Sequence, residues 1–117
     1  AGESVNIVAG PEDIISAEKL VFPGVGNFGS MMRILNEKQY VAPLLEYLRA
    51  DRPFLGICLG LRALLEASEE APDGPGLGFI GGTVRRFPPG DLSVPHIGWN
   101  GIRVHKPCGL LSGIEGD

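Results

Sequence analysis

The side chain best placed for chemistry is the thiol of Cys58, in the motif Gly56-Ile57-Cys58-Leu59-Gly60. The motif follows an apolar segment and precedes a run with helical spacing. Glycines two residues before and after a nucleophile remove side chains that would collide at a sharp strand-to-helix turn, as in the G-x-S-x-G elbow. We therefore predict that Cys58 is a nucleophile, with its thiolate favoured by the helix N-terminus and the Leu59 amide stabilising an oxyanion. The alternative is a structural cysteine buried in a core strand.

A second candidate site is the glycine-rich turn that contains Gly24, Val25 and Gly26. Several glycines after a strand allow backbone N–H groups to turn toward an oxyanion or a phosphate. The turn is neither a Walker A loop, since no Gly-Lys-Ser/Thr follows, nor a G-x-G-x-x-G motif. Taken alone, it is better explained as a plain turn before a helix.

The third candidate is the loop His96-Ile97-Gly98-Trp99-Asn100. An exposed tryptophan in a loop suits an anchor at a protein interface, and the alternative is a core tryptophan that closes a sheet edge. Two histidines and two cysteines lack the spacing of metal ligands, so we expect neither a metal nor a cofactor.

Alternating strands and helices would position these residues. We predict strands at residues 5–9, 19–22, 54–57, 83–87 and 102–104, helices at 11–17, 28–38, 41–48 and 59–68, and a solvated acidic loop at 69–78 that includes Glu69 and Glu70. Such alternation favours an α/β fold with a mostly parallel sheet flanked by helices. Because sites in parallel sheets form at the carboxyl ends of strands, the glycine turn and Cys58 are expected to meet there.

Composition excludes several classes of function. The 117 residues are 44% hydrophobic and 21% charged, which suits one globular domain rather than a disordered chain. A net charge of −4 without a basic patch predicts binding to neither nucleic acid nor an anionic membrane. The longest apolar stretch, residues 54–61, is too short to span a bilayer, and the start does not resemble a secretory signal. We expect a cytoplasmic protein with free thiols, an organelle being the alternative.

Taken in order, four segments closely resemble the glutaminase subunit or domain of imidazole glycerol phosphate synthase, a class I glutamine amidotransferase. They are residues 19–29, 53–61, 76–80 and 94–100, and the resemblance extends over about residues 5–113. The cysteine elbow is shared by all class I amidotransferases, whereas the Pro-His-Ile-Gly-Trp-Asn loop is more specific. The resemblance implies a flavodoxin-like three-layer fold, here incomplete.

The resemblance also implies a reaction. Cys58 would attack the side-chain amide of L-glutamine and form a thioester, and water would release glutamate. Residues 24–26 would complete the oxyanion site after a peptide rearrangement. Ammonia would pass to a (β/α)8 cyclase, present as a separate subunit or a fused domain, that makes imidazole glycerol phosphate in histidine biosynthesis. Residues 96–100 would face this cyclase.

Three departures from the family pattern qualify this expectation. The family's catalytic histidine and glutamate lie in a His-Pro-Glu segment that this sequence does not contain, and a first strand is expected before residue 1. We therefore expect residues 1–117 to be one partial amidotransferase domain. Arg62 stands where the family usually has glutamine near the substrate, and a long cation there would block or reorient glutamine. Another class I amidotransferase and a non-catalytic interaction module are the competing interpretations.

Overall fold

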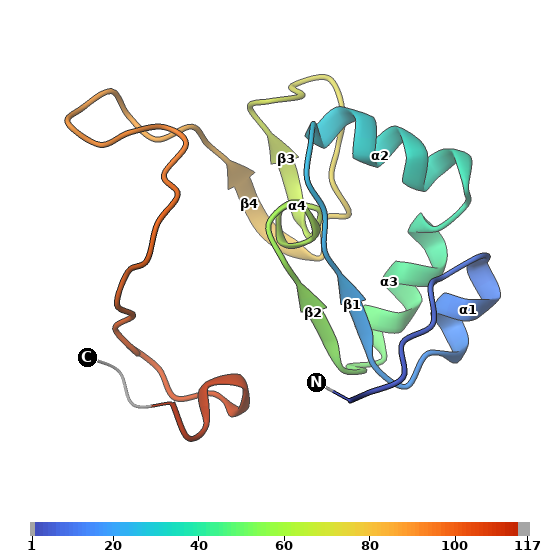
Figure 1. The fold of residues 1–117 in the computed structure, drawn as a ribbon. Helices are drawn as coiled ribbons and strands as arrows, with labels where there is room; N and C mark the ends of the chain where they lie inside the picture. The colour runs from blue at the N-terminus through green and yellow to red at the C-terminus, as the bar shows by residue number, and fades with distance from the viewer. Residues whose placement is uncertain (1, 115–117) are drawn as a thin grey trace. The chain divides into compact units, whose positions relative to one another are not determined.

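The computed structural model describes residues 2–114, which form two compact units that meet in sequence between Arg86 and Phe87. The elements of the first unit are α1 (Pro11–Ser16), β1 (Leu20–Phe22), α2 (Phe28–Glu37), α3 (Val41–Arg49), β2 (Phe54–Gly56), α4 (Leu59–Arg62), β3 (Leu65–Ser68) and β4 (Ile80–Val84) (Figure 1). The second unit contains a 3-10 turn, η1 (Gly109–Leu111). No helix within residues 2–114 is both long enough and apolar enough to cross a bilayer.

The strands pair in parallel, as the alternation of elements predicted. β1 lies beside β2 in a register that pairs Leu20 with Phe54 and Phe22 with Gly56. β3 pairs with β4 in the same sense, with an irregularity near Ala67. The described strands form two two-stranded sheets rather than one continuous sheet. Because β1 and β2 are parallel, the residues that follow both strands emerge at the same edge.

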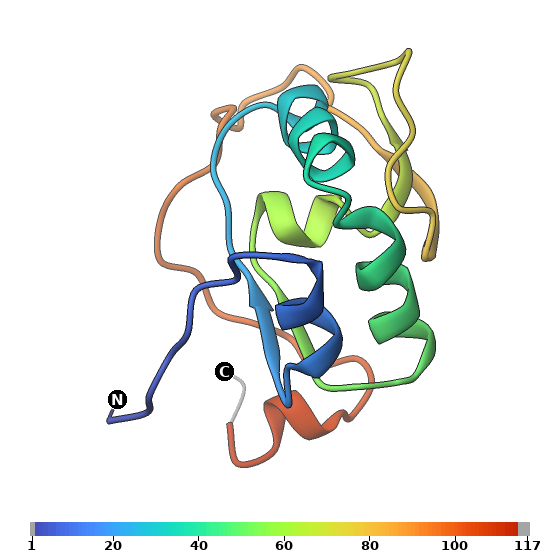
Figure 2. The ribbon, with the colours of Figure 1, turned by 90° about the vertical axis from the view of Figure 1, so that its right-hand side faces the viewer.

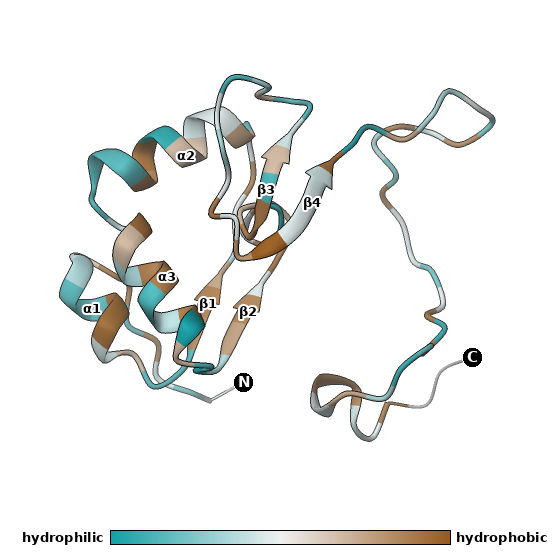
Figure 3. Cartoon of the chain, turned by 180° about the vertical axis from the view of Figure 1, so that it is seen from behind, coloured by the Kyte–Doolittle hydropathy of each residue, from teal (hydrophilic) through white to brown (hydrophobic). Residues whose placement is uncertain are grey.

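The hydrophobic core of the first unit lies between the helices and the β1–β2 pair. Helices α1 and α3 lie on one side of these strands (Figures 1 and 2). Brown and teal alternate along the helices in Figure 3, which agrees with their helical apolar spacing. The buried hydrophobic residues are Ile14, Leu20, Phe28, Met31, Met32, Leu35, Leu44, Tyr47, Leu48, Leu59, Ala63, Leu64 and Leu77. This core contains Leu59, and it therefore holds the start of α4 against the rest of the unit.

The turn from α3 into β2 is fixed by the side chain of Tyr47. This side chain is only 2% exposed, and its hydroxyl donates a hydrogen bond to the Pro53 carbonyl oxygen at 2.7 Å. The guanidinium carbon of Arg52 lies 4.7 Å from the centre of the Tyr47 ring, within the range of a cation–π contact. These contacts anchor the beginning of β2, the strand that leads to Cys58.

Two of the predicted strands are not strands in the structure. Residues 5–9 are irregular, with Val5 82% and Ile7 91% exposed, and no described strand pairs with them. Residues 102–104 also lack strand structure. Both segments are rich in β-branched residues, but a strand requires a neighbour that accepts its backbone hydrogen bonds, and neither has one among residues 2–114.

The predicted helix at residues 59–68 is wrong beyond Arg62. Helix α4 has only four residues, and Leu65–Ser68 forms β3 instead. The Ile80 amide donates to the Leu64 carbonyl at 2.8 Å, and the Glu69 amide donates to the Val84 carbonyl at 3.0 Å. Pairing with β4, which lies at Ile80–Val84 rather than at 83–87, thus overrides the local helical spacing.

Candidate active site

Cys58 occupies a strained turn between β2 and α4. Its backbone has φ 55° and ψ −110°, outside the regions that residues with a side chain commonly adopt. Hydrogen bonds fix the turn on both sides, since the Ile57 amide donates to the Phe22 carbonyl at 3.0 Å and the Arg62 amide donates to the Cys58 carbonyl at 3.1 Å. The Cys58 residue is exposed. The alternative of a structural cysteine buried in the core is therefore wrong.

The two flanking glycines are required by close contacts, as their spacing predicted. A Cβ at Gly60 would lie 1.7 Å from the Phe22 carbonyl oxygen. A Cβ at Gly56 would lie 2.9 Å from the Leu61 amide nitrogen. Neither neighbour is a flexible side chain, so a methyl group at either position would move the backbone of the turn. The elbow is therefore packed directly on the end of β1.

The glycine turn lies beside the elbow. The Leu59 amide donates a hydrogen bond of 3.3 Å to the Gly24 carbonyl oxygen, and a Cβ at Gly24 would lie 3.3 Å from Leu59 Cβ. Gly26 has φ +116°, which favours glycine, and Val25 between them is 92% exposed. The structure thus brings the predicted turn and the predicted oxyanion donor together. The Leu59 amide is occupied by a carbonyl in this arrangement.

Arg62 forms an ion pair with Glu70 beside this turn. Arg62 Nη1 lies 2.9 Å from Glu70 Oε2, and the side chains are 29% and 37% exposed. Arg62 Nη2 donates to the Gly26 carbonyl at 3.5 Å, and the same Glu70 oxygen accepts from the Phe28 amide at 3.3 Å. The Glu70 amide in turn donates to the Ser68 hydroxyl at 3.2 Å. Glu70 lies in an exposed turn, as expected, but its carboxylate also contacts Arg62 and the Phe28 amide, which the sequence did not predict.

The structure also changes the expected electrostatics of the elbow. With four residues, α4 aligns few peptide dipoles, fewer than the helix predicted at 59–68 would supply. The sequence signal that indicates the role of Glu70 is its opposite charge to Arg62, eight residues earlier. In the structure, β3 (Leu65–Ser68) lies between the two residues, and the turn that follows it brings the Glu70 side chain to Arg62.

The loop of residues 96–100 belongs to the second unit and is strongly exposed. Trp99 is 103% and Ile97 88% exposed, so Trp99 does not pack in a core of the described residues. The alternative of a core tryptophan is therefore wrong. His96 Nε2 and Asn100 Nδ2 lie 2.8 Å apart and form a hydrogen bond that ties the two ends of the loop together.

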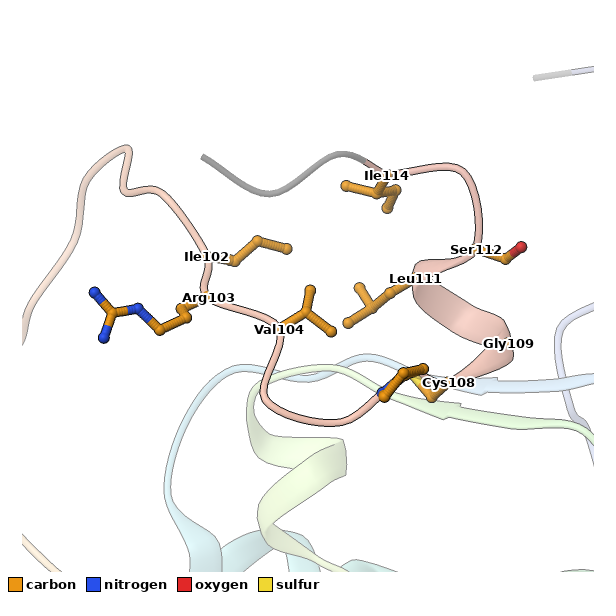
Figure 4. Close-up of a pocket in the computed structure, with 9 residues that line it drawn as sticks. Ile102, Arg103, Val104, Cys108, Gly109, Leu111, Ser112 and Ile114 are labelled. Atoms are coloured by element: carbon orange, nitrogen blue, oxygen red, sulfur yellow. The ribbon is translucent and has the colours of Figure 1, made fainter.

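The second unit has one further feature, a hollow that contains none of the predicted site residues. It is lined by Ile102, Arg103, Val104, Pro107, Cys108, Gly109, Leu111, Ser112 and Ile114 (Figure 4). Within residues 2–114, no three His, Cys, Asp or Glu side chains are grouped in a way that would hold a metal ion.

Sequence comparison identifies the family to which this arrangement belongs. The family model described as "Glutamine amidotransferase class-I" matches residues 4–116. The chain belongs to the class I glutamine amidotransferase family. The parallel strands and flanking helices of this amidotransferase chain are consistent with an incomplete flavodoxin-like α/β fold.

Several relatives of this amidotransferase chain carry more specific names. It is 42% identical over 113 residues to "Imidazole glycerol phosphate synthase subunit HisH" of Desulfitobacterium hafniense, covering 97% of this chain and 53% of the relative. It is 47% identical over 109 residues to the subunit of the same name from Thermococcus kodakarensis, covering 93% and 54%. It is 46% identical over 114 residues to "Imidazole glycerol phosphate synthase hisHF, chloroplastic" of Arabidopsis thaliana, covering 97% and 19%. The chain spans about half the length of the subunits and about a fifth of the longer relative.

Proposed function

We propose that this amidotransferase chain hydrolyses glutamine through a thioester on Cys58. We also propose that it supplies ammonia to a cyclase that makes imidazole glycerol phosphate in histidine biosynthesis. The observation that carries this proposal is the exposed thiol at positive φ, in a turn that requires glycine on both sides. A strained residue that is exposed rather than packed is typical of a functional site. The names of the relatives support the choice of imidazole glycerol phosphate synthase among class I reactions.

The proposed reaction begins when the Cys58 thiolate attacks the side-chain carbonyl carbon of glutamine. A tetrahedral oxyanion forms, and the Leu59 amide stabilises it once the Gly24 carbonyl has moved away from that amide. The carbon–nitrogen bond then breaks, and a proton is transferred to the departing nitrogen to give ammonia. Water attacks the thioester, releases glutamate and restores the thiol. In the family the proton is transferred by the histidine of the His-Pro-Glu segment, so turnover requires a gene product that carries that segment.

The proposed partner is a (β/α)8 cyclase that contacts the exposed loop of residues 96–100. Trp99 supplies a large, rigid apolar surface at the tip of this loop, and Ile97 extends it. The hydrogen bond between His96 and Asn100 preorganises the loop before it binds. The cyclase is a separate subunit or a fused domain. We place the reaction in the cytoplasm or in an organelle, since the Arabidopsis relative is named chloroplastic.

An electrophilic glutamine analogue, 6-diazo-5-oxo-L-norleucine, tests the glutaminase proposal. The complete gene product is incubated with the analogue, and labelling at Cys58 and Cys108 is followed by peptide mass spectrometry. Labelling of Cys58 well ahead of Cys108, and its suppression by L-glutamine, is the expected result. Cys108 is a matched control because it is also an exposed, free thiol. Equal, slow labelling of both thiols would instead support a non-catalytic interaction module.

A further inference from the structure

The ion pair between Arg62 and Glu70 has an unusual position for a surface contact. It connects α4 with the segment after β3, and each partner also contacts the glycine turn or the start of α2. Arg62 reaches the Gly26 carbonyl at 3.5 Å, and Glu70 accepts from the Phe28 amide at 3.3 Å. The pair therefore contacts the backbone two and four residues beyond Gly24.

The same region determines whether the Leu59 amide is available. The Gly24 carbonyl accepts from that amide at 3.3 Å, near the long end of the range for N–H···O hydrogen bonds. Glycines at positions 24 and 26 give the backbone freedom to reorient, because they tolerate backbone angles that other residues do not. A weak hydrogen bond in a glycine-rich turn is easily broken unless neighbouring contacts restrain the turn.

We infer that the Arg62–Glu70 ion pair is this restraint: it holds residues 24–28 in the orientation in which the Gly24 carbonyl covers the Leu59 amide. Arg62 and Glu70 are then positioning residues that limit the acylation of Cys58. The inference rests on the proposed function, because it assigns a role to the oxyanion site of the same thiol. The anchoring of Glu70 supports it, since the Glu70 amide donates to the hydroxyl of Ser68, which is only 2% exposed.

The consequence is a rise in reactivity when the pair is weakened. Releasing the turn frees the Leu59 amide to stabilise an oxyanion. Because the pair is about one-third exposed, it has the small strength of a surface ion pair, and we expect about a two- to fivefold effect on oxyanion-dependent acylation. Reactions of Cys58 that form no oxyanion should not change.

Two small reagents separate these reactions without requiring glutamine to bind. p-Nitrophenyl acetate acylates the thiol: the sulfur attacks the acetyl carbon, an oxyanion forms, and p-nitrophenolate leaves with the bonding electrons. Iodoacetamide alkylates the same sulfur by displacing iodide, with no oxyanion. The ratio of the two rates at Cys58, measured by peptide mass spectrometry on the complete gene product, reports the availability of the oxyanion site.

The variants Arg62→Gln and Glu70→Gln should each raise this ratio, and the double variant should raise it no further than the larger single effect. Added salt should raise the ratio of the native protein toward that of the variants and leave the variants unchanged. Arg33→Gln is the matched control. It removes a second ion pair, between Arg33 and Glu37 on α2, and should not alter the ratio.

An unchanged or lowered ratio in both Arg62→Gln and Glu70→Gln would overturn the inference while leaving the glutaminase proposal standing. If p-nitrophenyl acetate acylates Cys58 no faster than Cys108 in the native protein and in all variants, the elbow is not an activated site. That result would overturn the proposed function, and the inference would fail with it.

Discussion

Replacing Cys58 by glycine should stabilise the fold, although it removes the proposed nucleophile. The backbone at this position has φ 55° and ψ −110°, where a Cβ is in conflict with the backbone and glycine is not. Alanine is the comparison variant, because Cys58→Ala also removes the thiol but keeps the Cβ. The difference between the two variants therefore isolates the backbone strain from the loss of sulfur contacts.

The magnitude follows from two opposing effects. A residue held in a sparsely populated backbone region costs about 1–3 kcal/mol. Glycine recovers this strain but increases the conformational entropy of the unfolded chain, which offsets about 0.4–1 kcal/mol of the gain. We expect Cys58→Gly to be more stable than Cys58→Ala by about 1 kcal/mol, a difference in Tm of about 4 °C for a chain of this size.

Urea unfolding followed by circular dichroism measures this difference through the midpoints of variants with equal m-values. Cys108 supplies the control because it has an extended backbone, with φ −148° and ψ 156°, in which alanine fits without strain. There the glycine variant should gain nothing over the alanine variant. Equal midpoints for the two Cys58 variants, or a higher midpoint for Cys58→Ala, would show that the elbow stores no strain.

Three further results are expected. Gly60→Ala should lower the free energy of unfolding by about 3 kcal/mol or more and slow the labelling of Cys58, because its Cβ would lie 1.7 Å from the Phe22 carbonyl oxygen. Urea unfolding and labelling with the glutamine analogue measure the two effects, and a variant that changes neither would contradict the packing. Tyr47→Phe should cost about 1 kcal/mol in the same unfolding assay, because the Pro53 carbonyl loses its 2.7 Å donor; an unchanged midpoint would mean that the bond does not stabilise the turn. Trp99→Ala should weaken binding to the cyclase without changing the urea midpoint of unfolding. Calorimetry measures the affinity, and an unchanged affinity would rule out this loop as the interface.

The elements that the sequence predicted well are those whose pattern is local. The spacing of Phe28, Met31, Met32 and Leu35 predicts the buried face of α2, and the structure buries all four. β1 and β2 are short apolar runs that end at Pro-Gly and at the Cys58 elbow, and both lie within a residue of the expected bounds. In these segments, side-chain burial and backbone preference favour the same structure.

The errors arise where a distant partner decides the outcome. Leu65–Ser68 continues a helical pattern, yet it becomes β3 because Ile80–Val84 pairs with it. The β-branched residues at 5–9 favour a strand, but the described structure provides no neighbour for it. Local propensity differs by little between these states, and the hydrogen bonds of a sheet neighbour outweigh it.

The candidate site shows the same division. The glycine spacing around Cys58 identifies the elbow, because a Cβ at either Gly56 or Gly60 would collide with nearby backbone atoms. The position of the Gly24 carbonyl over Leu59 could not be predicted, because glycines permit several backbone orientations with the same sequence. The ion pair of Arg62 with Glu70 depends on the end of α4, which the helical pattern placed too late.

The register of β1 against β2 also determines where the chain can change in length. Phe22 pairs with Gly56, so Gly24 and Cys58 each lie two residues beyond a paired position. An insertion within either two-residue step would shift one half of the site past the other. An insertion in the turn between α2 and α3, at residues 38–40, would lengthen the connection between β1 and β2 without moving either half of the site. Gene variants with insertions or deletions should therefore retain the site when the change falls in that turn, and lose it when the change falls next to Gly24 or Cys58.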